Sequence, residues 1–212
     1  MEPFIKSYQF NFIEMQTQNL VNGHASVNDE AVLKALRYSS QDKILNLFPD
    51  IDKQQMDLLN PFIEIKEKLD AERFLLKLRP YVIPFKEVTE KTVKKLFPKV
   101  KKLKVPDFDY IDLKKVSYLS WNDKGSGKRY IITEYKDKLI GLQGTFKNSN
   151  QKGICTFCNG ISEVGMFMTE VKGDIKGTYI KRGNYICQDS ESCNHNLTEK
   201  DKVDTSIEYI LK

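Results

Sequence analysis

Four cysteines constrain this chain more than any other feature, because they lie as two pairs in its last third. The first pair, Cys155 and Cys158, stands in "GICTFCNG" with two residues between the sulfurs. The second pair, Cys187 and Cys193, stands in "YICQDSESCN" with five residues between. Such a set is compatible with a metal site, a disulfide framework or a redox centre.

The cellular compartment helps to choose among these three. The N-terminus, "MEPFIKSYQFNFIEMQTQN", lacks the basic start and apolar core of a signal peptide. No apolar run approaches the roughly 18 residues that a membrane span needs. We therefore expect a cytoplasmic protein, in which thiols stay reduced and a disulfide framework is disfavoured.

A metal site fits the cysteine pattern best. A thioredoxin-like redox motif lies at a strand-to-helix junction and needs no second pair. Tetrahedral zinc takes four thiolates, often as two short pairs, and a two-residue gap lets both sulfurs of a tight turn point inward. Asn159 and Gly160 suit such a turn. The sequence thus favours one zinc ion bound by all four cysteines, with unliganded thiols and a redox pair as alternatives.

A site with four cysteine ligands is structural, because no coordination position remains open for water or substrate. His195, two residues after Cys193, is an alternative ligand, although the four cysteines already complete the shell. The wide gap in the second pair predicts a loop between its cysteines. Four thiolates and one Zn²⁺ carry a net charge of −2, and Lys181 and Arg182 are candidates to offset it.

Residues 1–83 are predicted to form a bundle of about four helices. Apolar residues recur there at helical spacing, in segments that begin near residues 4, 28, 39 and 60. Asn28 is the expected N-cap of the second segment, and a separate helix is expected to start at Ser39 or Ser40. The last segment reads as one long helix that Pro80 and Pro84 end.

Residues 84–212 have a different pattern. Segments rich in β-branched and aromatic residues alternate with turn residues, as expected for strands: "KVSYLSW", "KRYIITEY", "KLIGLQGTF", "EVGMFMTEV" and "TYIKRGNYIC". An apolar stripe near the C-terminus predicts a final helix. The fold class is therefore α+β, with a helical bundle at 1–83 and a mixed α/β zinc-binding domain at 84–212.

The lysine-rich stretch at residues 89–106, "TEKTVKKLFPKVKKLKVP", has two interpretations, and the chain's net charge of +5 does not decide between them. Its lysines could bind phosphates. Alternatively, its regularly spaced apolar residues are buried and the lysines face water, and we favour this second interpretation. The lysines concerned are Lys91, Lys94, Lys95, Lys99, Lys101, Lys102 and Lys104.

No catalytic constellation stands out. The chain has no phosphate-binding G-x-x-x-x-G-K-[ST] motif, and "GSG" at 125–127 is only a turn. With two histidines, His24 and His195, a Ser-His or Cys-His triad is hard to assemble. We therefore expect a protein that is not an enzyme.

Several landmarks together resemble a known family. They are "KKLFPKVKKLKVP", Trp121, "KRYIITEY" and "GICTFCN…FM…YIKRGNYICQDSESCN". The chain resembles the fusidic acid resistance proteins of the FusB/FusC type, small cytosolic bacterial proteins that bind translation elongation factor G. The resemblance spans essentially the whole chain and is strongest from about residue 94 to residue 196.

The resemblance implies an N-terminal helical bundle, a C-terminal α/β domain, and one structural zinc bound by Cys155, Cys158, Cys187 and Cys193. It implies a protein that releases elongation factor G from ribosomes stalled by fusidic acid, leaving the drug unmodified. It also implies contacts with the C-terminal part of the factor through four residues. They are Ile154 at the first cysteine pair, Arg182 and Tyr185 in the "KRGNY" turn, and Tyr209 on the terminal helix. The alternative is a ribosome- or RNA-binding zinc protein that contacts rRNA through its lysines. A drug-modifying enzyme would need a nucleophile or cofactor site, which the sequence does not display.

Overall fold

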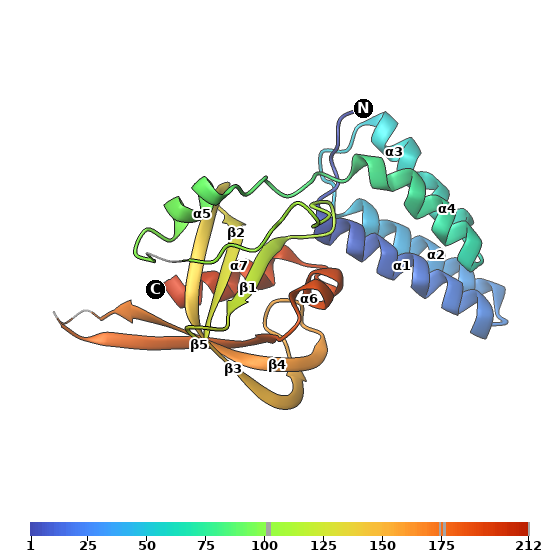
Figure 1. Ribbon diagram of the computed structural model, residues 1–212. Helices are drawn as coiled ribbons and strands as arrows, with labels where there is room; N and C mark the ends of the chain where they lie inside the picture. Colours follow the sequence, from blue (N-terminus) through green and yellow to red (C-terminus); the bar gives the residue numbers. More distant parts are fainter. Residues whose placement is uncertain (101–102, 174, 176, 212) are drawn as a thin grey trace. The chain divides into compact units, whose positions relative to one another are not determined.

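The computed structural model divides the chain into two compact units, Met1–Ile83 and Pro84–Lys212 (Figure 1). It describes residues 1–100, 103–173, 175 and 177–211. Among these residues, no helix is long and apolar enough to cross a lipid bilayer.

The first unit is helical and closes around one apolar cluster. Helix α1 packs against α2 and α4, and a β-bridge between Ile5 and Val82 joins the two ends of the unit. Buried side chains from the four α-helices and from η1, among them Leu20, Phe62 and Leu78, fill the core. The elements are α1 (Ser7–Ser26), α2 (Glu30–Leu45), α3 (Lys53–Leu59), α4 (Lys68–Leu78) and the 3₁₀ helices η1 (Asn60–Glu64) and η2 (Arg79–Tyr81).

The helical prediction for this unit is confirmed, but three of its details are wrong. Asp29, rather than Asn28, caps α2, because its carboxylate accepts from the amides of Ala31 and Val32. Helix α2 runs through Ser40 without a break, since Ser40 is buried in phase with the apolar stripe. The predicted long helix from residue 60 is interrupted between η1 and α4, where the chain becomes extended at Ile65.

The second unit is built on a five-stranded antiparallel sheet with strand order β1-β2-β3-β4-β5. Each strand pairs with its neighbours in sequence, so β1 and β5 are the edges (Figure 1). The β2–β3 hairpin turns at Lys136 and Asp137, both with positive φ, as a tight two-residue turn requires. The strands are β1 (Tyr118–Asp123), β2 (Lys128–Tyr135), β3 (Lys138–Ile154), β4 (Ile161–Lys172) and β5 (Tyr179–Cys187).

The two faces of the sheet are covered differently. Tyr130 and Ile132 of β2 face an apolar cluster supplied by α5 (Glu90–Leu96) and the segments around it. Helices α6 (Ser190–Asn196) and α7 (Lys200–Leu211) contact β1, β4 and β5. Side chains alternate between the two faces along β2, so Tyr135 lies on the face opposite Tyr130. The Tyr135 hydroxyl donates to Glu208 of α7, which places α7 on that opposite face.

The α5 face stays open over β4 and β5. The strand register places Met166 beside Lys147 and Tyr185, and Met168 beside Thr145 and Gly183, on the same face as Tyr130. Met168 and Tyr185 are exposed, whereas Tyr130 is buried. One half of this face therefore packs in the core, and the other half presents methionine and tyrosine side chains to solvent.

Candidate metal centre

The first cysteine pair lies in a tight turn between β3 and β4. The amide of Cys155 donates to the carbonyl of Gly160 at 3.0 Å, and the amide of Asn159 donates to the carbonyl of Cys155 at 2.8 Å. Asn159 has φ +57°, a left-handed conformation that asparagine tolerates better than most residues. The predicted roles of Asn159 and Gly160 in this turn, called the zinc knuckle below (residues 155–160), are thus confirmed.

The second pair differs from the prediction. Cys187 ends β5, but Cys193 lies in the short helix α6, rather than in a loop. The carboxylate of Asp189 caps this helix by accepting from the amides of Glu191 and Ser192. The helix aims Cys193 at the zinc knuckle, and this accounts for the wider spacing of the pair.

All four sulfurs meet in one buried cluster. The four Sγ atoms lie within 4.8 Å of one another, with Cys155–Cys193 at 3.6 Å and Cys158–Cys187 at 3.7 Å. A tetrahedron with Zn–S bonds of about 2.3 Å has sulfurs about 3.8 Å apart, so this arrangement fits a zinc ion. His195 is exposed on α6 and lies outside the cluster that the described residues form.

The sulfurs perturb one another's protonation. Hydrogen bonds from Cys158, Cys187 and Cys193 lower the pKa of the Cys155 thiol. Hydrogen bonding to Cys155 in turn raises the pKa of Cys158 and of Cys193. Four thiols this close therefore share their protons unequally, and a divalent cation would replace those protons.

Backbone and hydroxyl groups surround the sulfurs. The amide of Cys187 donates to Cys155 Sγ at 3.3 Å, and Ser162 Oγ lies 3.0 Å from Cys187 Sγ. Tyr118 is buried beside Cys193, and its ring meets Phe157 edge-on. Burial and the nearby Cys193 raise the pKa of Tyr118, so it stays a neutral hydrogen-bond donor toward the sulfur.

Arg129 is the residue near this centre that the sequence reasoning missed. It is buried, and its guanidinium donates to the carbonyls of Cys187 and Gln188 at 2.7 and 2.6 Å. Its Nε donates to Asn122, and the ring of Phe146 lies 3.4 Å from its central carbon. Burial lowers the pKa of Arg129 to about 10, so it stays charged at neutral pH.

Arg129, rather than Lys181 or Arg182, is therefore the cation beside the sulfur cluster. Lys181 is exposed and forms an ion pair with Glu170 at 3.5 Å. Arg182 donates to the carbonyl of Tyr209 in α7 at 2.9 Å. The sequence does not distinguish Arg129 from an exposed basic residue at the start of a hairpin strand, because it follows Lys128 directly after a turn.

The residues predicted to contact a partner lie around β5. Ile154, Tyr185 and Tyr209 are 61%, 47% and 52% exposed, so none of them is a core residue. Arg182 is half-buried, and its guanidinium lies 5.7 Å from the centre of the Tyr209 ring. Tyr185 and Arg182 have opposite parity in β5 and therefore lie on opposite faces of the edge strand.

One expectation about Arg182 is wrong. The "KRGNY" segment predicts a turn beside Gly183 with the Arg182 side chain free to reach solvent, but Arg182 lies within β5 opposite Thr169. The strand continues through it because Gly183 packs directly against β4. Arg182 is consequently held in place by α7 before any partner binds.

The lysine-rich stretch packs its apolar side chains inward. Val93 and Phe97 are buried, and Leu96, Val100, Leu103 and Val105 pack against the same cluster. Thr89 caps α5 through its hydroxyl. The lysines at 91, 94, 95, 99 and 104 are exposed, while Lys101 and Lys102 lie outside the described residues. This arrangement agrees with the interpretation that the lysines form the solvent-exposed face of a segment whose apolar residues are packed.

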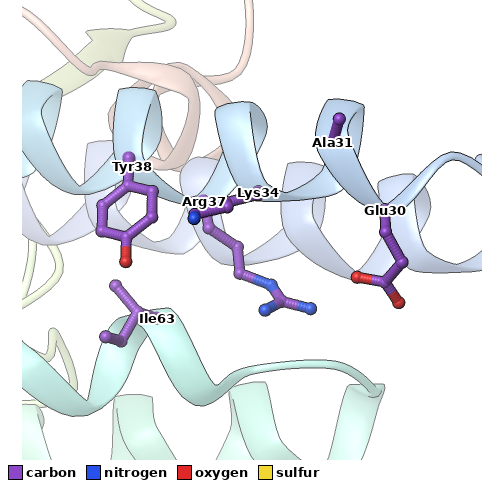
Figure 2. A pocket seen from close by; sticks show the side chains of 6 residues that line it. All are labelled: Glu30, Ala31, Lys34, Arg37, Tyr38 and Ile63. Carbon is purple, nitrogen blue, oxygen red and sulfur yellow. The ribbon is translucent and has the colours of Figure 1, made fainter.

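A cavity of about 320 Å³ opens in the helical unit, between α2 and η1 (Figure 2). Figure 2 shows Arg37, Tyr38 and Glu30 extending from α2 toward η1, which supplies Ile63. Arg37 donates to His24 at 3.4 Å. The cavity lining contains no serine, cysteine or histidine, so a nucleophile–base pair is not assembled there.

Comparisons with known proteins agree with this site. Residues 4–86 match the family model described as "Elongation factor G-binding protein, N-terminal". Residues 94–209 match the model described as "FBP C-terminal treble-clef zinc-finger". A comparison with curated protein sequences gave no match.

Among solved structures, the fusidic acid resistance protein FusC is similar, with 31% sequence identity and a TM-score of 0.83. The match covers 98% of this chain and 98% of FusC. The treble-clef match and the buried cysteine cluster fit one structural zinc ion. The chain therefore belongs to the FusB/FusC-type family of elongation factor G-binding proteins.

Proposed function

We propose that this protein binds elongation factor G and promotes its release from ribosomes stalled by fusidic acid. The observation that carries the proposal is the match to FusC over nearly the full length of both chains, together with the treble-clef family match. Resistance then arises by protection of the drug's target. Such a protein acts in the cytoplasm, where ribosomes and the factor are.

In this proposal the four cysteines bind one zinc ion with a structural role. The ion joins the zinc knuckle to the end of β5 and to α6, because the four cysteines come from these three segments. When bound, the zinc ion supplies folding free energy and performs no chemistry. Arg129 offsets the charge of the thiolates and orders the carbonyls of Cys187 and Gln188.

The contact surface for the C-terminal part of elongation factor G is formed by Ile154, Arg182, Tyr185 and Tyr209. Exposed aromatic rings on a braced backbone lose little entropy on binding, which favours them as anchors. Arg182 and Tyr209 already contact each other, so they present one preorganised unit. Tyr185 approaches the partner from the other face of β5.

The proposal also requires that the protein does not chemically modify fusidic acid. Incubation of the drug with the pure protein and common cosubstrates, followed by mass spectrometry of the drug, tests this. We expect unmodified drug at every time point. Formation of an adduct or fragment with catalytic turnover would contradict the proposal.

The alternative function, direct binding to ribosomal RNA, draws on the five described lysines at residues 91–104 that face solvent. Binding through several phosphates weakens steeply with salt, by about a thousandfold or more between low and moderate concentrations. A protein interface with aromatic anchors weakens much less. The salt dependence therefore separates the two functions.

The deciding experiment is titration of the pure protein with elongation factor G by calorimetry at two salt concentrations. A parallel assay measures rescue of translation stalled by fusidic acid. We expect saturable binding that changes little with salt, and recovery of translation when the protein is added. Absence of binding to the factor, with salt-sensitive binding to ribosomes alone, would favour the RNA function.

A further inference from the structure

The outer edge of β5 is only partly paired. In an antiparallel strand, the backbone N–H and C=O groups of alternate residues point to opposite sides. Two bonds identify the groups that point away from β4: the carbonyl of Tyr185 accepts from the amide of Thr156 at 2.9 Å, and the amide of Cys187 donates to Cys155 Sγ at 3.3 Å. The zinc knuckle thus pairs with the end of this edge.

The same alternation of inward and outward backbone groups continues through the preceding residues of β5. Lys181 and Gly183 point their backbone N–H and C=O groups outward, as Tyr185 does. Arg182 points its carbonyl toward β4, where Thr169 Oγ1 lies at 3.5 Å. Within the described part of the chain, the outward backbone groups of Lys181 and Gly183 have no hydrogen-bond partner. The edge therefore continues beyond the zinc knuckle as an unfilled strand position.

The side chains around this edge are suited to a protein partner. A Cβ atom at Gly183 would lie 2.8 Å from Met168 Cγ and 3.1 Å from Met166 Sδ, so both methionines extend over the strand. Methionine adapts its shape to different apolar partners. Tyr179 and Tyr185, on the same face, are exposed at either side of Gly183. An extended chain along the edge would find apolar contacts on this face.

We propose that the edge of β5 from Tyr179 to Gly183 binds an extended segment of the partner protein by β-strand addition. The proposal rests on the proposed function in taking elongation factor G as that partner. Strand addition uses main-chain hydrogen bonds for affinity and alternate side chains for specificity. The segment would lie in line with the zinc knuckle and between Tyr185 on one face and Arg182 on the other.

Charge favours a foreign acidic segment over a second copy of this chain. Lys181 stands on the open edge and pairs with Glu170 of β4 at 3.5 Å. Lys172 and Arg182 lie close by in the β4–β5 ladder, so positive charges outnumber this one carboxylate. Antiparallel pairing of two copies along this edge would bring like charges together, which destabilises cross-strand pairs. Lysine on an open edge is also a common protection against self-association. An apolar segment that carries Asp or Glu meets no such repulsion.

Amide hydrogen exchange of the full, zinc-loaded chain tests this directly. The chain is labelled with ¹⁵N and studied free and in complex with unlabelled elongation factor G. We expect the amides of Lys181 and Gly183 to exchange quickly in the free chain and at least about tenfold more slowly in the complex, as new hydrogen bonds protect them. Protection of the same amides in the free chain at high concentration would instead assign the edge to a second copy.

Two variants at one position provide a matched pair. Lys181→Pro removes the outward N–H without removing a bond to β4, whereas Lys181→Thr removes the same side chain and keeps the N–H. We expect Lys181→Pro to bind elongation factor G about tenfold more weakly than Lys181→Thr, the effect of one lost hydrogen bond. Circular dichroism and zinc content check that β5 remains folded in both.

The outcomes separate the two proposals. If the wild-type chain does not bind elongation factor G, the proposed function fails. If it binds while the amides of Lys181 and Gly183 stay unprotected, strand addition alone is wrong. If Lys181→Pro disturbs the fold, the exchange measurement on the wild-type chain still decides.

Discussion

The helical unit and the zinc-bearing end of the second unit use different means to fix their structure. In the first, the core is a cluster of apolar side chains that runs from Ile5 to Val82 and draws on the four α-helices and η1. In the second, the zinc knuckle, the end of β5 and α6 meet at four sulfurs and one buried arginine. The first arrangement distributes stability over many contacts, while the second concentrates it in a few atoms. Loss of the metal should therefore disrupt only the second arrangement, and a cavity in the apolar core only the first.

The largest effect is expected from loss of the metal. Cys158→Ser, or treatment with a chelator, should unfold the zinc knuckle, the end of β5 and α6 while the helical unit stays folded. Structural zinc in small domains supplies on the order of 10 kcal/mol or more, which is comparable to the whole stability of a typical domain. Amide exchange, followed separately in α1 and β5, would measure this. His195→Ala is the matched control and should retain one zinc by native mass spectrometry; loss of zinc there would make His195 a ligand.

A smaller effect is expected at the buried arginine. Arg129→Met leaves the carbonyls of Cys187 and Gln188 without their donor and the thiolates without their cation. Loss of one partner from a buried charged pair costs about 3–5 kcal/mol, and zinc should dissociate faster. Denaturant unfolding and the rate of zinc transfer to a chelating dye are the measurements. Lys128→Met, the neighbouring cation, should change both by little; equal effects would remove the special role of Arg129.

The helical unit is tested by a cavity in its core. Leu20→Ala removes a fully buried side chain and should lower the free energy of unfolding of this unit by about 3 kcal/mol. Zinc content and the exchange of β5 amides should not change. Leu76→Ala, at a side chain that is 69% exposed, is the control and should cost less than about 0.5 kcal/mol. Zinc loss in the Leu20 variant would show that the two units are energetically coupled.

The contact surface gives the smallest effects. Arg182→Ala and Tyr185→Ala should each weaken binding to elongation factor G by about 2 kcal/mol, as anchors of an interface do. Lys99→Ala, on the exposed side of the lysine-rich stretch, should cost less than about 0.5 kcal/mol. Calorimetry of all three, with zinc content as the check of folding, decides. A lysine effect as large as the tyrosine effect would move the interface to the basic stretch.

Local chemistry made much of the fold readable from the sequence. The β-branched strands and the Asn159-Gly160 turn have local sequence patterns, and those patterns predict them. Helix α6 was missed because "SESCNHN" has no apolar periodicity; it forms around a cap and a cysteine. The second half of β3, "KNSNQKGI", was missed because its polar residues disfavour strands. Pairing with β4 across a bulge near Asn150 overrides that preference.

The site was readable in part for the same reason. The cysteine spacing predicted the four sulfurs that lie together in the structure, because the ligands of a metal site recur at recognisable spacings in the sequence. No sequence pattern indicates the role of Arg129, because that role depends on carbonyl groups 58 and 59 residues away. The opposite faces of Arg182 and Tyr185 do not follow from the sequence either, because "KRGNY" predicts a turn at Arg182 rather than a strand. Strand alternation settles their faces only when the strand's extent is known.

The bond from Thr156 to Tyr185 ties the metal and the partner to one strand. If zinc braces β5 and elongation factor G binds β5, the two binding events are thermodynamically linked. Reciprocity then requires that the factor tighten zinc binding by the same ratio by which zinc tightens binding of the factor. The factor would act as a cofactor for metal retention, and drug resistance in a cell would follow its supply of zinc.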